Sequence, residues 1–372
     1  MKLHSLQALR AAAAMLVVID HAILFLVWNG ALPRAPYEHL AWFLGGLGVY
    51  VFFVISGFIM MHASGDMFGT GATGRFLLRR AVRIVPLYWA GTTLIIMLRI
   101  LEGNAPSLHE VTTSVAFITA PNEQGKSMRP LLGQGWTLTY EAMFYVVFSV
   151  GLVFRRRLGL PLIVGGLIAV IGLGTLHKPL SDTSGATDWA AFYTDPILIL
   201  FAVGIGVHAL SRRLPPLGSG AALSLAAVTM AAAVLLFVSA IQAYPVSLSW
   251  TLIIFALATL CVLFATLDRD SACGRFGAAL GRLGDASYAV YIFHSFVIMV
   301  AGRVLMKIGL LNPWIFVPLI IVASGVLGHL IHIYFEKPVM KVLNGWIERW
   351  AAARRAGTTS TGAAVWTGAA RS

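Results

Sequence analysis

Apolar residues fill long, nearly unbroken stretches of this chain, and short polar segments separate them. Several stretches are about 20 residues long, the length that an α-helix needs to cross the hydrocarbon core of a bilayer. Because lipid offers no water to unpaired backbone groups, each stretch is predicted to be helical. We predict ten spans, at about residues 7–28, 45–63, 86–102, 136–154, 160–176, 194–210, 221–241, 248–267, 286–307 and 314–335. The pattern therefore predicts an all-α, polytopic membrane protein.

Composition supports the same class. Of the 372 residues, 58% are hydrophobic and 11% are charged, and the mean hydropathy is +0.83, whereas soluble domains carry about 25% charged residues. The net charge of +12 does not predict a nucleic-acid partner, because the basic residues are spread over short loops. Cys261 and Cys273 support neither a disulfide framework nor a metal site.

The basic residues also predict an orientation. A cytoplasmic N-terminus puts most of the 27 lysines and arginines in inner loops, and an even number of spans then leaves both termini cytoplasmic. Lys2 and Arg10 before an apolar run are also typical of a secretory signal, but no small-residue cleavage site follows. We expect one integral membrane domain, 1–340, and a cytoplasmic tail, 341–372, which its Ala, Thr, Gly and Ser content predicts to be disordered.

The first span carries two chemically active side chains. Arg10 and His21 are eleven residues apart, which places them on one helical face about 16 Å apart along the axis. His21 is either a buried histidine bonded to a neighbouring helix or a base that takes a proton near pH 7. Asp20 is predicted to point to another face, so spacing alone gives no dyad with His21.

A basic loop precedes the third span. Arg79, Arg80 and Arg83 stand just before Pro86, a residue that suits a helix start, and their spacing of three and four places Arg79 and Arg80 on one face with Arg83. These arginines either anchor the protein to lipid headgroups or bind phosphate through bidentate hydrogen bonds. With Arg10 nearby, the second reading suits a polyphosphorylated cytosolic donor such as a coenzyme A thioester.

The outer side offers a loop and a carboxylate. Gly103–Gly135 contains a ten-residue apolar run, Val111–Ala120, which is too short to cross and predicts an interfacial or re-entrant segment. Glu141 lies inside the fourth span and needs a partner. Glu141 either forms a structural ion pair with Arg99 or takes part in the reaction, where it orients His21 or binds acceptor hydroxyls.

Aromatic and polar side chains accompany these groups. Trp136, Tyr140 and Tyr145 surround Glu141 and are either an interfacial belt or a platform for a sugar. In the ninth span, Tyr291 and His294 share a face with Ser287 and either bond a neighbouring helix or contact substrate. Glu336, before Pro338 at the end of the last span, is expected to be structural.

Together these segments resemble the acyltransferase 3 family of integral membrane O-acyltransferases, especially the exopolysaccharide-production acyltransferases of bacteria. The resemblance runs over about residues 5–340 and rests on LQALRAAAAMLVVIDH, GVYVFFVISGFIM, RRAVRIVPLYW, WTLTYEAMFY, LGDASYAVYIFH and FEKP. Thr137 stands where the family usually has serine, and Asp20 is not part of the general pattern.

The resemblance implies a ten-helix enzyme of the bacterial inner membrane. It would move an acyl group, expected to be acetyl, from cytoplasmic acyl-CoA to a sugar hydroxyl of an exopolysaccharide or its lipid-linked precursor. No permanently bound cofactor is implied; acetyl-CoA is the expected co-substrate. Arg10 and His21 match the family's essential pair, Arg80 and Arg83 its cytoplasmic arginines, and Glu141 its WSLxxE glutamate. Many members carry a fused periplasmic hydrolase-like domain for which this chain ends too soon, so direct delivery is expected.

Two alternatives stay open. A transporter or flippase for a phosphorylated glycolipid would use the same arginines, although the chain shows none of the internal repeats that transporters have. An acyltransferase acting on a small molecule such as an antibiotic would share the reaction and the site.

Overall fold

The computed structural model describes residues 4–121, 128–179, 186–240, 248–268 and 275–366, and no β-strand occurs among them. The first half of the chain forms α1 (His4–Trp28), α2 (Arg34–Ser64), α3 (Thr73–Leu101), α4 (Leu108–Val115), the 3₁₀ turn η1 (Gly133–Gly135), α5 (Trp136–Val153) and α6 (Arg156–Gly174). The second half forms α7 (Trp189–Tyr193), the 3₁₀ turn η2 (Pro196–Leu198), α8 (Ile199–Ser211), α9 (Ser219–Ala240), α10 (Leu248–Thr266), α11 (Arg275–Asp285), α12 (Ser287–Lys307), α13 (Pro313–Ile331), the π-helical turn η4 (His332–Glu336) and α14 (Lys337–Trp366).

The hydropathy pattern predicts the architecture correctly. Within the described residues, ten helical segments are long and apolar enough to cross a membrane, as many as the sequence predicts, and the all-α class is confirmed. The sixth of these segments, Trp189–Ser211, is interrupted. It consists of α7, η2 and α8, because Asp188 and Asp195 each accept a backbone N–H and start a new helical turn.

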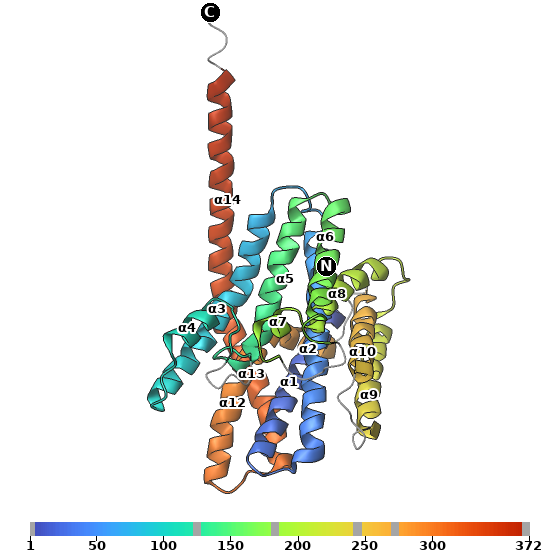
Figure 1. Ribbon diagram of the computed structural model, residues 1–372, viewed down its shortest axis with the longest axis vertical. Helices are drawn as coiled ribbons and strands as arrows, with labels where there is room; N and C mark the ends of the chain where they lie inside the picture. The colour runs from blue at the N-terminus through green and yellow to red at the C-terminus, as the bar shows by residue number, and fades with distance from the viewer. Residues whose placement is uncertain (1–3, 122–127, 180–185, 241–247, 269–274, 367–372) are drawn as a thin grey trace, which may run out of the picture.

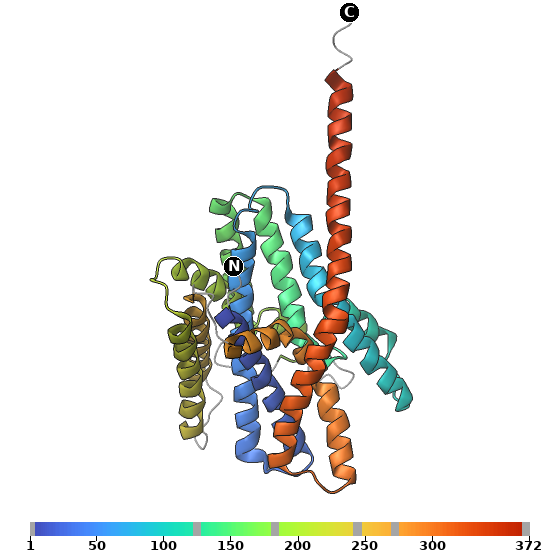
Figure 2. The ribbon, with the colours of Figure 1, turned by 180° about the vertical axis from the view of Figure 1, so that it is seen from behind.

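Helix α2 lies at the centre of the bundle and packs against α1, α8 and α10. Small residues allow these close crossings. A side chain at Gly48 would overlap the Ala13 carbonyl of α1, and one at Gly57 or Gly204 would overlap the backbone of the facing helix at the α2–α8 crossing. Figure 1 shows α9 and α10 side by side at one edge of the bundle and α4 at the opposite edge, and Figure 2 shows the same arrangement from behind.

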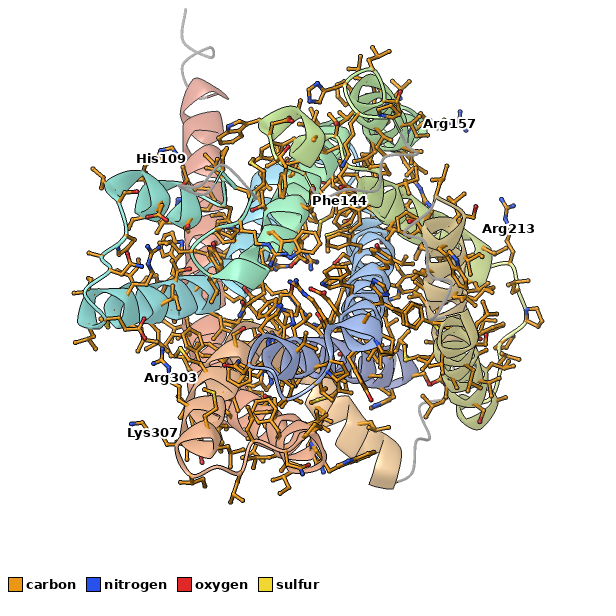
Figure 3. The ribbon with its side chains drawn as sticks, turned by 60° about the horizontal axis from the view of Figure 1, so that its bottom comes forward. His109, Phe144, Arg157, Arg213, Arg303 and Lys307 are labelled. Carbon is orange, nitrogen blue, oxygen red and sulfur yellow. The ribbon has the colours of Figure 1, made fainter. Side chains whose placement is uncertain are left out.

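Aromatic rings fill the core between α2, α5 and α8. Phe201 stacks on Phe53 with a centroid distance of 4.8 Å and on Phe144 with a distance of 4.2 Å. Figure 3 shows Phe144 inside the bundle, while Arg157, Arg213, Arg303 and Lys307 lie at its periphery. The ring stack fixes α5 against α2, and both helices supply residues of the site described below.

Helix α3 corrects one sequence prediction. The arginines before Pro86 do not form a loop, because α3 begins at Thr73 and contains Pro86 in its interior. Proline is tolerated inside membrane helices, where neighbouring groups satisfy the backbone that it leaves unpaired. The prediction that the helix starts near Pro86 is therefore wrong.

The last helices correct a second prediction. Pro338 does not end the helix: α13 continues through η4 into α14, which projects far beyond the bundle (Figure 1). The π-helical turn lies just before Pro338, whose missing N–H removes a regular helical bond. Helix α14 includes residues 341–366 of the tail for which composition predicts disorder. Residues 367–372 lie outside the described residues.

The segment between α3 and α5 is anchored by a capping box. Ser107 accepts the backbone N–H of Glu110, and the Glu110 carboxylate accepts the Ser107 N–H in return, which starts α4. Arg99 Nη1 pairs with Glu110 Oε1 at 3.2 Å. Arg99 is therefore bonded to α4, and its predicted pairing with Glu141 is wrong. The apolar run Val111–Ala120 is only partly helical, because α4 ends at Val115.

Candidate active site

Two neighbouring cavities lie inside the bundle, and α1 contributes to both. We call the first the arginine cavity; its volume is about 80 Å³ and its polar lining includes Arg10, Arg80, Arg83 and Glu141. We call the second the histidine cavity; its volume is about 610 Å³ and it is lined by His21, Asp20 and residues of several other helices. Because Arg10 is near the start of α1 and His21 is in its second half, the cavities lie toward opposite ends of that helix.

The arginine cavity carries an excess of positive charge. Arg10 is buried, with 7% of its surface exposed, and Nη1 donates to Gln7 Oε1 at 3.2 Å. Arg80 lies over the Phe76 ring, 5.5 Å from its centroid, and its buried Nε has no hydrogen-bond partner among the described residues. Three guanidinium groups facing one carboxylate, Glu141, leave net positive charge in a site shielded from water, which favours an anionic ligand.

Arg79 differs from the other three arginines. It forms an ion pair with Glu348 of α14, and both side chains are about half exposed. Arg79 is not among the residues that line the arginine cavity. The structure thus brings together three of the four arginines that sequence predicts as a phosphate site, Arg10, Arg80 and Arg83, and leaves Arg79 outside.

Glu141 lies in the arginine cavity rather than beside His21. Its Oε1 accepts hydrogen bonds from Ser56, at 3.2 Å, and from Tyr145. Tyr145 lines the same cavity. The three predicted aromatics are therefore distributed over different places: Trp136 lines the histidine cavity, and Tyr140 is buried, where its hydroxyl donates to the Phe192 carbonyl at 2.7 Å.

His21 and Asp20 contact each other in the histidine cavity. His21 Nδ1 lies 3.1 Å from Asp20 Oδ2 and 3.0 Å from the Val17 carbonyl oxygen. Neighbours on a helix normally diverge, but the imidazole folds back over the preceding turn and the short Asp20 side chain reaches it. The prediction that spacing gives no dyad is wrong.

A second imidazole adjoins His21. The His294 ring meets the His21 ring edge to face, with the centroids 4.9 Å apart. His294 is 1% exposed, and its Nδ1 faces the carbonyl oxygens of Tyr291, at 2.8 Å, and Val290, at 3.2 Å. Since a carbonyl only accepts, Nδ1 carries the proton. The buried Nε2 has no partner among the described residues.

A wall separates the two cavities, and Tyr291 and Val49 line both sides of it. The Tyr291 hydroxyl lies 2.7 Å from Thr137 Oγ1 and 3.1 Å from the Gln134 carbonyl. Both polar atoms of the Gln134 side chain bond to α12: Nε2 donates to the Ile292 carbonyl, and Oε1 accepts from the Ser295 hydroxyl. These bonds fasten η1 and α5 to α12 between the two cavities.

Several lining residues escape prediction from the sequence. Ser56 and Tyr288 line the arginine cavity, and Trp28, Trp42 and Arg129 line the histidine cavity. An isolated serine or tryptophan in an apolar run gives no signal of its own. Glu336, expected to be structural, is buried and its Oε2 lies 2.8 Å from His332 Nδ1 within η4.

Comparisons with known proteins show what this chain is similar to. Residues 3–347 match a family model described as an acyltransferase domain. The chain is 32% identical over 307 residues to the exopolysaccharide production protein ExoZ of Rhizobium meliloti, an alignment that covers 80% of this chain and 90% of that protein. No solved structure matches the chain.

Proposed function

Because this chain belongs to the acyltransferase 3 family and is a membrane acyltransferase, we propose that its two cavities receive the two substrates of one acyl transfer. Acyl-CoA, with acetyl as the expected acyl group, enters the arginine cavity, and a sugar hydroxyl enters the histidine cavity. The observation that carries this proposal is the shared wall: Tyr291 and Val49 line both cavities, so a donor in one cavity and an acceptor in the other approach each other beside these two side chains.

The donor assignment rests on charge. Arg10, Arg80 and Arg83 face the arginine cavity, and guanidinium groups bind phosphate oxygens through paired hydrogen bonds. The volume of about 80 Å³ suits the narrow thioester end of the donor rather than its nucleotide. We therefore propose that the arginines guide the phosphates at the mouth of the cavity while the thioester extends toward Tyr291. The positive-inside distribution of charge supports a cytoplasmic mouth.

The acceptor assignment rests on size and chemistry. The histidine cavity, at about 610 Å³, is within the range of ligand sites, and Trp28, Trp42 and Trp136 offer flat apolar faces beside polar groups. The similarity to an exopolysaccharide production protein supports a sugar unit of an exopolysaccharide, or its lipid-linked precursor, as the acceptor. We propose the bacterial inner membrane as the location.

His21 is the proposed general base. Its Nε2 takes the proton of the acceptor hydroxyl while the hydroxyl oxygen attacks the thioester carbonyl carbon. The C–S bond then breaks, the ester forms on the sugar, and the proton passes to the departing sulfur, which leaves as the free thiol of coenzyme A. Atoms and charge balance without a metal or a redox step.

The test is transfer of label from acetyl-CoA in membranes that contain the protein, with the purified polymer or its lipid-linked precursor as acceptor. His21→Ala should lower the rate by about 10²–10⁴-fold, the usual contribution of a general base. His177→Ala, which changes an exposed histidine, is the matched control.

A second pair of variants distinguishes damage to the donor site from a general effect of removing a positive charge. Arg83→Ala should raise the KM for acetyl-CoA, whereas Arg303→Ala, which removes an exposed arginine paired with Glu102, should not. Equal transfer by wild type and His21→Ala would sink the proposal. Movement of a glycolipid across the membrane without acyl-CoA would favour a flippase, and transfer to a small molecule alone would favour the other acyltransferase reading.

A further inference from the structure

Asp20 is an unusual group to find inside a membrane helix. It is 6% exposed, and only one of its two oxygens, Oδ2, has a partner among the described residues, His21 Nδ1 at 3.1 Å. The other oxygen, Oδ1, is buried without a hydrogen bond there. A buried carboxylate that is half satisfied is costly, so its presence requires a reason.

The contacts of His21 fix its tautomer. Nδ1 faces the Val17 carbonyl oxygen at 3.0 Å and Asp20 Oδ2 at 3.1 Å. Because a carbonyl can only accept, Nδ1 must carry the proton, and Nε2 keeps its lone pair. His21 lines the histidine cavity with about a third of its side chain exposed, so this basic nitrogen is available to a ligand there.

Helix α2 provides the space that Asp20 occupies. A Cβ atom at Gly45 would overlap Oδ2 and Cγ of Asp20, so the carboxylate packs directly on the backbone of α2 at this point. At the next residue, Gly46, the nearest atom to an added Cβ is in the Tyr50 ring at 3.7 Å, an ordinary contact. The position of the Asp20 carboxylate therefore depends on glycine at 45 and not at 46.

A role as a link between helices does not explain Asp20. Polar groups that hold membrane helices together bond across the helix interface, whereas in the described part of the chain the ion-pair contact of Asp20 is with His21, on the same helix. Gly45 offers space but no donor side chain. The contact therefore acts on the neighbouring imidazole.

We propose that Asp20 is a positioning residue for the acyl transfer. It holds the His21 ring with Nδ1 protonated and Nε2 directed into the histidine cavity, and Gly45 leaves the space that the Asp20 carboxylate occupies. This inference rests on the proposed function of His21. The carboxylate also stabilises the imidazolium that forms when Nε2 accepts the proton of the acceptor hydroxyl.

The experiment measures kcat and KM separately for Asp20→Ala, Gly45→Ala and the control Gly206→Ala, each purified into lipid nanodiscs and normalised to folded protein. Asp20→Ala should lower kcat about 10–100-fold, as expected for loss of a group that orients a functional histidine, with each KM within about twofold of wild type. Gly45→Ala should lower kcat without altering any polar group, and Gly206→Ala, which has open space around an added methyl group and lines neither cavity, should match wild type.

The double variant Asp20→Ala/Gly45→Ala provides the sharpest test. If Gly45 acts through the carboxylate, the added methyl group takes the space vacated by Oδ2 and Cγ, the remaining Cβ atom of residue 20 at 3.2 Å needs only a small shift, and the double variant is no slower than Asp20→Ala alone. An unchanged kcat in Asp20→Ala, or a raised KM at normal kcat, overturns the proposal. Lower thermal stability at normal kcat assigns Asp20 a structural role and overturns it too.

A second readout is independent of acyl transfer. Diethyl pyrocarbonate reacts with unprotonated imidazole nitrogen, and peptide mass spectrometry reports the extent at each histidine. At a pH at which both imidazoles are neutral in both proteins, Asp20→Ala should slow modification of His21 several-fold relative to His177 in the same sample, because the ring is no longer held with Nε2 toward the cavity. If wild type transfers no acyl group, the proposed function fails; equal His21 modification in both proteins defeats the positioning role whether or not transfer occurs.

Discussion

Removal of the Tyr291 hydroxyl tests how the wall between the cavities is held. Tyr291→Phe keeps the ring and deletes the oxygen that lies 2.7 Å from Thr137 Oγ1 and 3.1 Å from the Gln134 carbonyl. Thr137 Oγ1 also lies 3.1 Å from that carbonyl. The three contacts share two hydroxyl protons, so two hydrogen bonds form at any moment.

The number of hydroxyl protons gives the expected loss in the free energy of unfolding. In Tyr291→Phe the Thr137 hydroxyl still donates to the Gln134 carbonyl, and in Thr137→Val the Tyr291 hydroxyl does so, so each single variant loses one bond. Each should cost about 1 kcal/mol in the free energy of unfolding. The double variant loses both bonds, and its cost should be the sum, about 2 kcal/mol.

The assay is equilibrium unfolding of the purified protein in mixed micelles, followed by tryptophan fluorescence. Tyr334→Phe, at a residue that is 76% exposed, is the control and should stay within about 0.5 kcal/mol of wild type. If the three contacts were independent, each single variant would lose two of them and the double variant three. A double-variant cost clearly below the sum would therefore refute the proton count.

Three further outcomes follow from the structure. Gly57→Ala should destabilise the α2–α8 crossing by about 1–3 kcal/mol, because a methyl group there overlaps the backbone, whereas Gly206→Ala, with open space around it, should not; thermal unfolding in detergent measures both. Arg79→Ala should leave the KM for acetyl-CoA unchanged where Arg83→Ala raises it, since Arg79 lies outside the arginine cavity; initial rates at varied acetyl-CoA decide this. The Ala191 N–H that Asp188 accepts lowers the pKa of that carboxyl, so the cap on α7 is intact at neutral pH and weakens as the pH falls through that pKa. The protection factor of the Ala191 amide, which compares its exchange rate with the intrinsic rate at the same pH, should therefore fall in acid for wild type, and Asp188→Asn should lack this dependence.

Helix number and class were predictable because lipid leaves the backbone no alternative to helices, and apolar length then counts the spans. The helix ends were less predictable. Pro86 is a sound signal for a helix start in water, yet within α3 it is interior, and Pro338 follows a π-helical turn instead of ending the chain of helices. The rules that place prolines at helix ends apply to helices in water. Inside the bundle, neighbouring groups can satisfy the backbone that a proline leaves unpaired, so a helix can continue through it.

The residues of the candidate site were also predictable only in part. The apolar length of the first span correctly puts Arg10 and His21 on one helix, and the structure places one of them in each cavity. Helical periodicity fails for Asp20, because the direction of a side chain at the contact depends on a glycine of another helix, Gly45. For Arg99 the sequence did contain the answer: Ser107 and Glu110 have the spacing of a capping box, which places a carboxylate in the loop near Arg99.

The shared wall has a consequence for the cell as well as for the reaction. A bacterial inner membrane, the location proposed above, stores a proton gradient and must stay sealed, yet Tyr291 and Val49 line both of two cavities that lie toward opposite ends of α1. In the inner membrane that we propose as the location, the hydrogen bonds of Tyr291 would hold a side chain that helps to keep the bilayer sealed. A variant that shortens this side chain should dissipate the membrane potential of its host even where no polymer is made, so that ion permeability, rather than loss of acylation, sets the limit on how far this position can change.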